Sequence, residues 1–382
     1  MKKIIRITTV PTSLKTLLKG QLKFMSAHYN IIGVSSSGKE MHDVEQDEGV
    51  ETHIVEMTRS ITPIKDLIAT YKLYKLLKRE KPLIVHTHTP KAGTLGMLAA
   101  KLAKVPHRLH TIAGLPLLEA SGLKRKLLNF VEKVTYANAT LILPNSFGLL
   151  DIIKAHKFTN DNKLKVIAHG SSNGIDIDHF NKALISTESQ QDLKQSLGIE
   201  SSDFVFIFVG RLVADKGINE LIEAYSRVNS KHQNTKLLLV GTFETELDPL
   251  EPKTLEAIET NPSILPVGWQ NDVRPYFAIS NALVFPSYRE GFPNVVMQAS
   301  AMELASIVTD INGCNEIITH NANGIIVPPK DAEALYQSML SLLTEDDLCQ
   351  SLSQSARANI TSKYQRNFVW EELLKLYKSL EH

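Results

Sequence analysis

The chain has 382 residues, a length that predicts two or three domains. Hydrophobic residues at 43% and charged residues at 22% are typical of a globular protein with sizeable cores. The 42 basic and 41 acidic residues leave a net charge of +1, which excludes a nucleic-acid binder that relies on bulk charge but leaves a local basic face possible. Two cysteines, Cys314 and Cys349, are too few for a disulfide framework or a structural zinc site and indicate a reducing cytoplasm.

The N-terminus predicts a first strand and not a targeting segment. Its early lysines resemble those of a signal peptide, but Arg6 interrupts the apolar run and no small-residue cleavage site follows. No stretch approaches the roughly 18 uninterrupted apolar residues that a membrane span needs. We therefore predict a cytoplasmic protein that touches a membrane, if at all, from its surface.

Short apolar strands alternate with amphipathic helical patterns in the first half of the chain. The predicted strands are residues 4–10, 30–34, 52–55, 83–86, 108–112, 140–143 and 164–167. Helical spacing joins Ile64, Leu67, Ile68, Tyr71 and Tyr74, and again Leu123, Leu127, Phe130, Val131 and Val134. Repeated strand–helix–strand units imply parallel pairing with right-handed crossovers, and hence a doubly wound α/β domain.

The alternation pauses over residues 170–180, which are rich in turn formers, and over the polar segment 186–195. It then restarts with predicted strands at 204–209, 236–240, 264–266, 282–285, 306–308 and 324–327, and the tail from Asp331 reads as helical. The sequence therefore predicts two α/β domains that are joined near residue 180.

The first motif with chemical meaning follows the buried strand at 204–209. Gly210 and Arg211 form a turn, and Lys216 and Gly217 precede a helix. Open α/β sheets bind ligands where a strand end leads into a helix N-terminus, and the backbone N–H groups there favour anions. Arg211 and Lys216 add two positive charges, which suits a diphosphate. The alternative is that both are ordinary loop cations, because short motifs are weak signals.

The second motif follows the strand at 282–285. A turn carries Glu290, and Pro293 is expected as the first helical residue, where its missing N–H costs nothing. Gly291 lets the backbone approach a ligand closely. The free N–H groups of residues 292–295 would face the same crevice as the two cations. Alternatively, the segment is a tight strand-to-helix turn with a solvated glutamate.

Together these segments resemble the retaining GT-B glycosyltransferases of family 4, which carry Gly-Arg-Leu-x3-Lys-Gly followed by Glu-Gly-Phe. The later segments 310–318 and 323–327, and the junction 173–180, are also similar to that family. The likeness covers essentially the whole chain and is strongest over residues 205–330. Within the family, residues 287–294 and 88–93 look most like those of bacterial enzymes that build polysaccharide on lipid-linked precursors.

The resemblance implies a fold of two Rossmann-like domains that face each other across a cleft. Residues 1–180 would bind the acceptor and residues 181–365 the nucleotide sugar, and a helix at 366–382 would return to the first domain. A glycine pair that is common in the family after the first strand is replaced by Pro11-Thr-Ser-Leu14.

The resemblance also implies roles for individual residues. Arg211 and Lys216 would neutralise the departing nucleoside diphosphate, Glu290 would bind donor-sugar hydroxyls, and His110 would lie near the reacting carbon. The implied donor-binding residues are Gly210, Arg211, Lys216, Glu290, Gly291, Phe292, Pro293, Asn294 and Gln298. Position 298 is a second glutamate in the family, where it binds ribose. Gln298 can still accept and donate hydrogen bonds, but it loses the stronger charge-assisted one.

The predicted function is transfer of a sugar, with retention of anomeric configuration, from a UDP-sugar to a lipid-linked saccharide in bacterial surface polysaccharide synthesis, without metal or cofactor. One alternative is a GT-B nucleotide-sugar 2-epimerase, for which no set of acid–base carboxylates can be assembled. Another is a non-catalytic nucleotide-sugar binder, which Gln298 motivates. A dinucleotide dehydrogenase is disfavoured, because no Gly-x-Gly-x-x-Gly follows the first strand.

Two further groups of residues have open interpretations. His86, His88, His107 and His110 lie near the ends of two neighbouring strands, but no cysteine or carboxylate cluster accompanies them, so pocket histidines are favoured over zinc ligands. The segment 124–126 is basic, and Lys15, Lys19 and Lys23 recur at four-residue spacing on the predicted first helix. These lysines are either a solvated face or a surface that docks on the anionic inner leaflet, at about 1 kcal/mol per charge. The implied lipid-linked acceptor favours docking.

Overall fold

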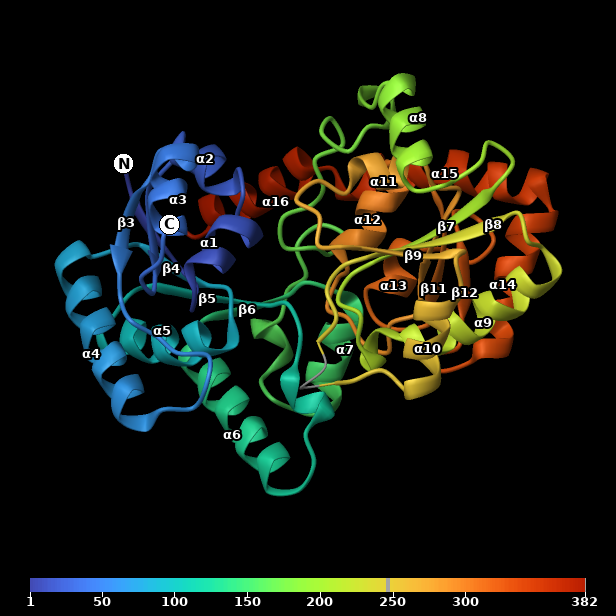
Figure 1. Ribbon diagram of the computed structural model, residues 1–382. Helices are drawn as coiled ribbons and strands as arrows, with labels where there is room; N and C mark the ends of the chain where they lie inside the picture. The colour runs from blue at the N-terminus through green and yellow to red at the C-terminus, as the bar shows by residue number, and fades with distance from the viewer. Residues whose placement is uncertain (245–247, 382) are drawn as a thin grey trace. The chain divides into compact units, whose positions relative to one another are not determined.

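The computed structural model describes residues 1–244 and 248–381, which form two compact units (Figure 1). The first unit comprises Met1–Gly174 together with the segment from Arg366 onward, and the second comprises Ile175–Gln365. The sequence analysis placed residues 175–180 in the first domain. They pack with the second instead, because Ile175 N–H donates to Tyr364 O at 2.8 Å and Arg357 Nη1 donates to Phe180 O at 2.8 Å.

A six-stranded parallel sheet with the order β3-β2-β1-β4-β5-β6 forms the centre of the first unit. Its strands are β1 Lys3–Ile7, β2 Asn30–Ser35, β3 Glu51–Ile54, β4 Ile84–Thr87, β5 His107–Ile112 and β6 Leu141–Pro144. Its helices are α1 Pro11–Leu17, α2 Gln21–Ser26, α3 Glu40–Glu48, α4 Pro63–Glu80, α5 Pro90–Leu102, α6 Gly122–Asn138, α7 Phe147–Ala155 and α16 Arg366–Ser379. The strand order reverses between β1 and β4, and such a switch point is where doubly wound sheets bind ligands.

Alternating burial along the strands divides the core of the first unit into two layers. Ile4 on β1 packs with α1, α2, α3 and α16, whereas Ile5 and Ile7 pack with α4, α5, α6 and α7 on the opposite face. In Figure 1 the red helix α16 accordingly lies beside the blue α2, and Trp370 contacts Phe24 there with ring centroids 5.3 Å apart. The C-terminal helix thus completes the hydrophobic cover of the first sheet.

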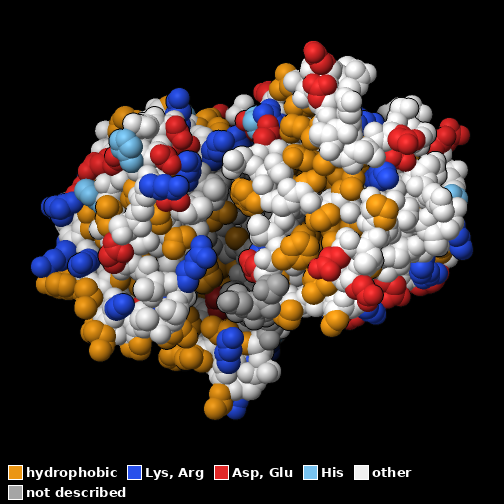
Figure 2. Space-filling model, in the orientation of Figure 1, with side chains coloured by type: hydrophobic (Ala, Val, Ile, Leu, Met, Phe, Trp, Pro, Cys, Tyr) orange, Lys and Arg blue, Asp and Glu red, His pale blue; other side chains and the backbone are white. Residues whose placement is uncertain are grey.

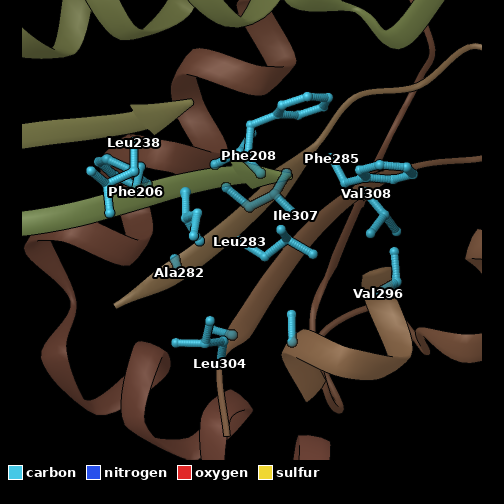
Figure 3. Close-up of a cluster of buried hydrophobic side chains, with 14 of the residues drawn as sticks. Phe206, Phe208, Leu238, Ala282, Leu283, Phe285, Val296, Leu304, Ile307 and Val308 are labelled. Atoms are coloured by element: carbon cyan, nitrogen blue, oxygen red, sulfur yellow. The ribbon is translucent and has the colours of Figure 1, made fainter. Parts of the chain in front are cut away.

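The second unit repeats this topology, with a parallel sheet of order β12-β11-β10-β7-β8-β9 whose switch point lies between β7 and β10. Its strands are β7 Phe204–Val209, β8 Thr235–Val240, β9 Ile264–Gly268, β10 Ala282–Phe285, β11 Ala305–Thr309 and β12 Ile325–Val327. Its helices are α8 Thr187–Ser196, α9 Ile218–Lys231, α10 Pro252–Thr260, α11 Arg274–Ala278, α12 Asn294–Ala301, α13 Cys314–Ile317, α14 Ala332–Thr344 and α15 Asp346–Tyr364. Side chains such as Phe206, Leu283 and Ile307 form its buried centre (Figure 3).

The predicted α/β fold class is confirmed, but two local predictions are wrong. Residues 164–167 form no strand: Leu164 makes a single bridge to Ile142, and Ala168 then turns the chain away with a φ of 50°. The helix expected to carry Lys15, Lys19 and Lys23 is divided into α1 and α2, because Gly20 has a left-handed φ of 77°. The three lysines therefore do not form one helical face.

Among the described residues, no helix is both long enough and apolar enough to cross a membrane.

Candidate active site

The two motifs of the second unit meet at the switch point between β7 and β10. The loop after β7 passes through the short 3-10 helix Ala214–Lys216 and reaches Gly217, which has a φ of 71°. A side chain at Gly217 would overlap the carbonyl oxygen of Pro286 in the loop after β10. Only glycine therefore allows the two loops to approach this closely.

Lys216 and Glu290 form an ion pair across these two loops. Lys216 Nζ lies 2.5 Å from Glu290 Oε1, and Ser287 Oγ donates to the same carboxylate oxygen at 3.1 Å. The two side chains are only 15% and 18% exposed, so water screens their charges less than it screens a surface pair. An ammonium group has three donors, so Lys216 can bind an anion while it keeps Glu290.

Arg211 lies on the same loop but in a different environment from Lys216. Its Nη1 is 2.8 Å from Glu244 Oε2, and its side chain is 47% exposed. The preceding Gly210 packs against Gly241 at the end of β8, where a side chain on Gly241 would overlap the Gly210 carbonyl. The structure thus places the two predicted diphosphate cations on one loop, each with its own carboxylate partner.

Two side chains, one at the end of β11 and one in the loop after it, bind backbone carbonyls of the turn that carries Glu290. Asn312 Nδ2 donates to Glu290 O at 2.6 Å and to Gly291 O at 3.1 Å, and Thr309 Oγ1 donates to Ser287 O. The sequence analysis used residues 310–318 only for the family resemblance and gave Asn312 no role. In the sequence, Asn312 appears as an asparagine beside a glycine after a predicted strand. That local pattern does not indicate a hydrogen-bond partner 22 residues earlier in the chain.

A pocket of about 410 Å³ opens beside the Arg211 side of this site. Its lining comes from the carboxyl ends of β7 and β8 and the loops after β7, β8 and β9, with two residues from the start of the unit and one from α12. These residues are His179, Phe180, Val209, Gly210, Arg211, Val240, Gly241, Thr242, Trp269, Gln270, Asn271, Asp272, Val273 and Gln298. Its volume lies in the range of small-molecule sites. Gln298, at the position where the resemblance implied a second glutamate, therefore lines a cavity and not the core.

The remaining donor-binding candidates follow Glu290 and divide between the core and the surface. Phe292 is buried against Tyr364, with ring centroids 5.3 Å apart, so its side chain serves packing. Pro293 was expected as the first helical residue, and this is wrong: its ψ of 111° is extended, so it precedes α12 as the N-cap. Asn294 begins the helix and is exposed.

His110 lies on β5 in the first unit, near the carboxyl edge of the sheet. Its Nδ1 is 2.7 Å from Thr87 Oγ1, and α5 packs so closely on the ring that a side chain at Gly93 would overlap it. Burial lowers the pKa of His110 to about 4, although a hydrogen bond to the Thr87 carbonyl works in the opposite direction. The imidazole is therefore neutral at pH 7.

His86 and His88 point to the opposite face of the first sheet and form a buried polar cluster there. His86 bonds Tyr377 Oη at 2.6 Å through Nδ1 and Thr111 Oγ1 at 2.7 Å through Nε2. Arg6 Nε donates to His88 Nε2 at 2.9 Å, which fixes His88 as neutral. Burial lowers the pKa of both histidines well below the usual value.

These hydrogen bonds leave the histidines without the geometry of a zinc site. His107 begins β5, three residues before His110, so the two side chains point to opposite faces of the sheet. In the part of the chain that the structure describes, no three His, Cys, Asp or Glu side chains are grouped so as to hold a metal ion. The sequence analysis did not identify Arg6 and Gln21, which share this cluster through a hydrogen bond of 2.5 Å.

Comparison with known proteins gives the family and the class of this fold. Residues 189–359 match the family described as glycosyl transferases group 1, and residues 7–146 match the family described as glycosyl transferase 4-like. Among solved structures, Anabaena Alr3699/HepE in complex with UDP aligns with a TM-score of 0.81 over 99% of this chain and 100% of that one, at 16% identity. A Rickettsia africae glycosyltransferase aligns with a TM-score of 0.79 over 99% and 98%, at 20% identity. The fold is GT-B.

Curated relatives extend over most of the sequence. The capsular polysaccharide biosynthesis glycosyltransferase CapM of Staphylococcus aureus is 32% identical over 99% of this chain and 97% of its own length. The UDP-Gal:alpha-D-GlcNAc-diphosphoundecaprenol alpha-1,3-galactosyltransferase of Escherichia coli is 30% identical over 83% of this chain and 81% of its own length. The chain therefore belongs to the GT-B glycosyltransferases of family 4, as the resemblance of its motifs predicted.

Proposed function

We propose that this glycosyltransferase moves a sugar from a UDP-sugar to a lipid-linked saccharide, with retention of anomeric configuration, in the synthesis of a bacterial surface polysaccharide. The observation that carries the proposal is the enclosed pair of Lys216 and Glu290 at the switch point of the second unit. It supplies one cation and one acid at the place where a doubly wound sheet binds its ligand.

The pair suits the two ends of a nucleotide sugar. As the glycosidic bond breaks, negative charge grows on the diphosphate, so the Lys216 ammonium stabilises the transition state more than the ground state. The Glu290 carboxylate can accept hydrogen bonds from sugar hydroxyls. The pocket that Gln298 lines has room for the nucleoside. A uridine nucleotide is supported by the UDP complex of the structural relative and by the name of the Escherichia coli enzyme.

The acceptor assignment draws on two relatives and on the first unit. The Escherichia coli relative and a Campylobacter jejuni relative, 27% identical over 87% of this chain and 86% of its own length, are both named for diphospho-undecaprenol acceptors. The first unit offers His110, whose low pKa keeps it neutral. A neutral imidazole can bind an acceptor hydroxyl without adding a charge near the reacting carbon.

Turnover without a divalent metal is part of the proposal, because Lys216 supplies positive charge where other enzymes use a cation. We expect activity to survive EDTA at close to the untreated rate. Full loss in EDTA that Mg²⁺ or Mn²⁺ restores would contradict this element of the proposal.

The deciding experiment offers a panel of nucleotide sugars together with a synthetic polyprenyl-diphosphate sugar and reads the products by mass spectrometry. We expect one UDP-sugar to extend the acceptor by one sugar, and the anomeric configuration of the new bond, read by NMR, to match the donor. Lys216→Ala should abolish most of the product, whereas Lys253→Ala, which removes an exposed lysine on α10, should not. A sugar altered without transfer would instead indicate an epimerase, and no change at all would indicate a binding protein.

A further inference from the structure

The outward face of α4 carries a stripe of apolar side chains that the core of the first unit does not use. Ile64, Leu67, Ile68 and Tyr71 follow the i, i+3, i+4, i+7 spacing that normally marks a buried face, yet they are 78%, 73%, 50% and 55% exposed. The core takes the opposite face of the helix instead, through Ala69, Leu73, Leu76 and Leu77. The helix is thus apolar on two sides.

The first half of α6 repeats this pattern. Leu123, Leu127 and Phe130 form another helical stripe and are 84%, 48% and 65% exposed. The buried residues of this helix, among them Tyr136, lie in its second half. The periodicity of both helices was read correctly from the sequence, but the stripe that it identified points away from the core.

The two stripes lie at the same edge of the first unit. α5 packs against both α4 and α6, so the three helices form one layer on one face of the sheet. Each crossover helix of a parallel sheet begins at the carboxyl edge of the strands, and both stripes occupy the first half of their helix. In Figure 2, hydrophobic side chains accordingly gather along the lower edge of this unit, over the lower part of α4 and the tip of α6 in Figure 1, with basic side chains beside them.

The charges around the stripes are mostly positive. The basic residues of the two helices are Lys65, Lys72, Lys75, Lys78, Arg79, Lys124, Arg125, Lys126 and Lys133. Two of their acidic residues have partners outside these helices: Asp66 pairs with Lys91 at 2.6 Å and Glu80 with Lys3 at 2.7 Å. Glu80 also pairs with Arg79 of its own helix at 2.6 Å. Burial raises the pKa of Glu132 to about 6. The apolar stripes are therefore bordered by positive charge that local carboxylates do little to offset.

We propose that this α4–α6 surface, formed by the two apolar stripes and the lysines beside them, docks the first unit on a bilayer rich in anionic lipid. The apolar side chains enter the interface between headgroups and acyl chains, and the lysines bind headgroup phosphates. The carboxyl edge of the first sheet, near which His110 lies, would then be brought close to the lipid. The inference rests on the proposed function in that the acceptor is lipid-linked. The α4–α6 surface takes the place of the lysine face that the sequence suggested on the first helix, where Lys15 instead pairs with Asp43 at 2.7 Å.

The test is flotation of the full chain with vesicles of phosphatidylcholine, alone or mixed equally with phosphatidylglycerol. We expect strong preference for the mixed vesicles. Combining Leu67→Glu with Leu127→Glu should weaken that binding at least tenfold, because two inserted side chains become charged. Leu102→Glu is the matched control: this leucine is 57% exposed in the same helix layer but ends α5, at the opposite edge, so binding should be unchanged.

A second double variant keeps the test valid if the leucine substitutions prevent folding. Lys72→Glu with Lys126→Glu changes only exposed charges and should remove the preference for anionic vesicles. Wild-type flotation by the Leu67/Leu127 variant would overturn the proposal. Absence of vesicle binding together with a dimer that these leucine changes dissociate, as seen by sedimentation, would also overturn it and assign the surface to a second copy of the chain.

Failure of docking and failure of the proposed function give different results. With a short, water-soluble acceptor, the leucine variant should turn over at the wild-type rate. With an acceptor embedded in vesicles, its turnover rate should be at least tenfold below that of the wild type. Wild-type protein that binds anionic vesicles but transfers no sugar to either acceptor would refute the function and leave the docking surface standing.

Discussion

The two units share one strand order but differ in the chemistry at their switch points. In the second unit, the loops after β7 and β10 are joined by two ion pairs, Lys216 with Glu290 and Arg289 with Asp215, of which the first is the more enclosed. In the first unit, the carboxyl edge near β4 and β5 carries histidines that burial keeps neutral. The same scaffold thus presents paired charges at one switch point and neutral buried imidazoles at the other, which fits the charged donor and the acceptor hydroxyl of the proposed function.

Arg6 sharpens this contrast, because it is a fully buried cation whose hydrogen bonds go to neutral groups. It donates to His88 and Gln21, and burial lowers its pKa. Arg211 in the second unit is half-exposed and paired with a carboxylate. A buried charge without an opposite charge is costly, and the cost here is moderated only by hydrogen bonds. Arg6 is therefore held by hydrogen bonds inside the first unit, whereas Arg211 in the second remains reachable from solvent.

The largest expected effect follows from removing the enclosed cation. Lys216→Ala should lower kcat by roughly 10²–10³, by analogy with the loss of one preorganised donor to a developing negative charge, and should raise the donor KM less. Arg211→Ala should act in the same direction. Steady-state kinetics with the donor varied separates the two constants.

The control for Lys216→Ala is Lys253→Ala, which removes an exposed lysine whose partner is Glu251. We expect both of its constants to stay near wild type. If Lys216→Ala turned over at the wild-type rate, the charged and neutral switch points would not differ in function as described.

The second effect is a pH dependence confined to the first unit. The pKa of His110 is about 4 in the folded protein against an ordinary 6.5, so below pH 6.5 the unfolded state binds the proton and the folded state does not. Stability is therefore present above pH 6.5 and is lost as pH falls towards 4. At pH 5.5 the loss from His110 alone is about 1 kcal/mol, and His86 and His88 change in the same direction.

Hydrogen exchange at pH 7.5 and 5.5, corrected for intrinsic rates, measures this difference between the units. β4 and β5 should lose protection at the lower pH, whereas β7 and β10 should not, because none of the described histidines of the second unit is buried. Equal loss in both units would contradict the contrast.

A smaller effect of opposite sign comes from Glu132 on α6. Burial raises the pKa of its carboxyl to about 6, so the folded state holds a proton that the unfolded state releases between about pH 4.5 and 6. Stability falls as pH rises through this window. Glu132→Gln should therefore raise the free energy of unfolding at pH 7 by up to about 2 kcal/mol and remove this dependence. Denaturant melts at pH 5 and pH 7 check it, and destabilisation at pH 7 would refute the assignment.

The smallest effect concerns the pocket beside Arg211. Gln298→Glu introduces, at a position that lines the pocket, the acid that the family resemblance implied. A charge-assisted hydrogen bond to the ribose of the proposed donor gains about 1 kcal/mol over a neutral one. The donor KM should fall roughly fivefold with little change in kcat. A change confined to kcat would place this residue nearer the reacting atoms than the pocket does.

Apart from the false strand at residues 164–167, the sequence allowed the strands and the two site loops to be predicted, because strand periodicity and turn glycines are local signals. It did not show which face of α4 or α6 is buried, since a helical stripe such as Ile64 to Tyr71 has the same spacing whether it meets a core or a lipid surface. Partners such as Asn312 for the Glu290 turn, and Arg6 for His88, also could not be predicted. Their hydrogen bonds join segments that only the folded sheet brings together.

The most direct measurement for the central claim is hydrogen exchange of the full chain with and without UDP. The account predicts that UDP protects the loop after β7, residues 210–217, and the loop after β10 with the start of α12, residues 286–298, while β4 and β5 stay unchanged. Lys216→Ala should weaken this protection. Protection centred on β4 and β5, with the second unit unaffected, would contradict the assignment of the charged ligand to the Lys216–Glu290 site.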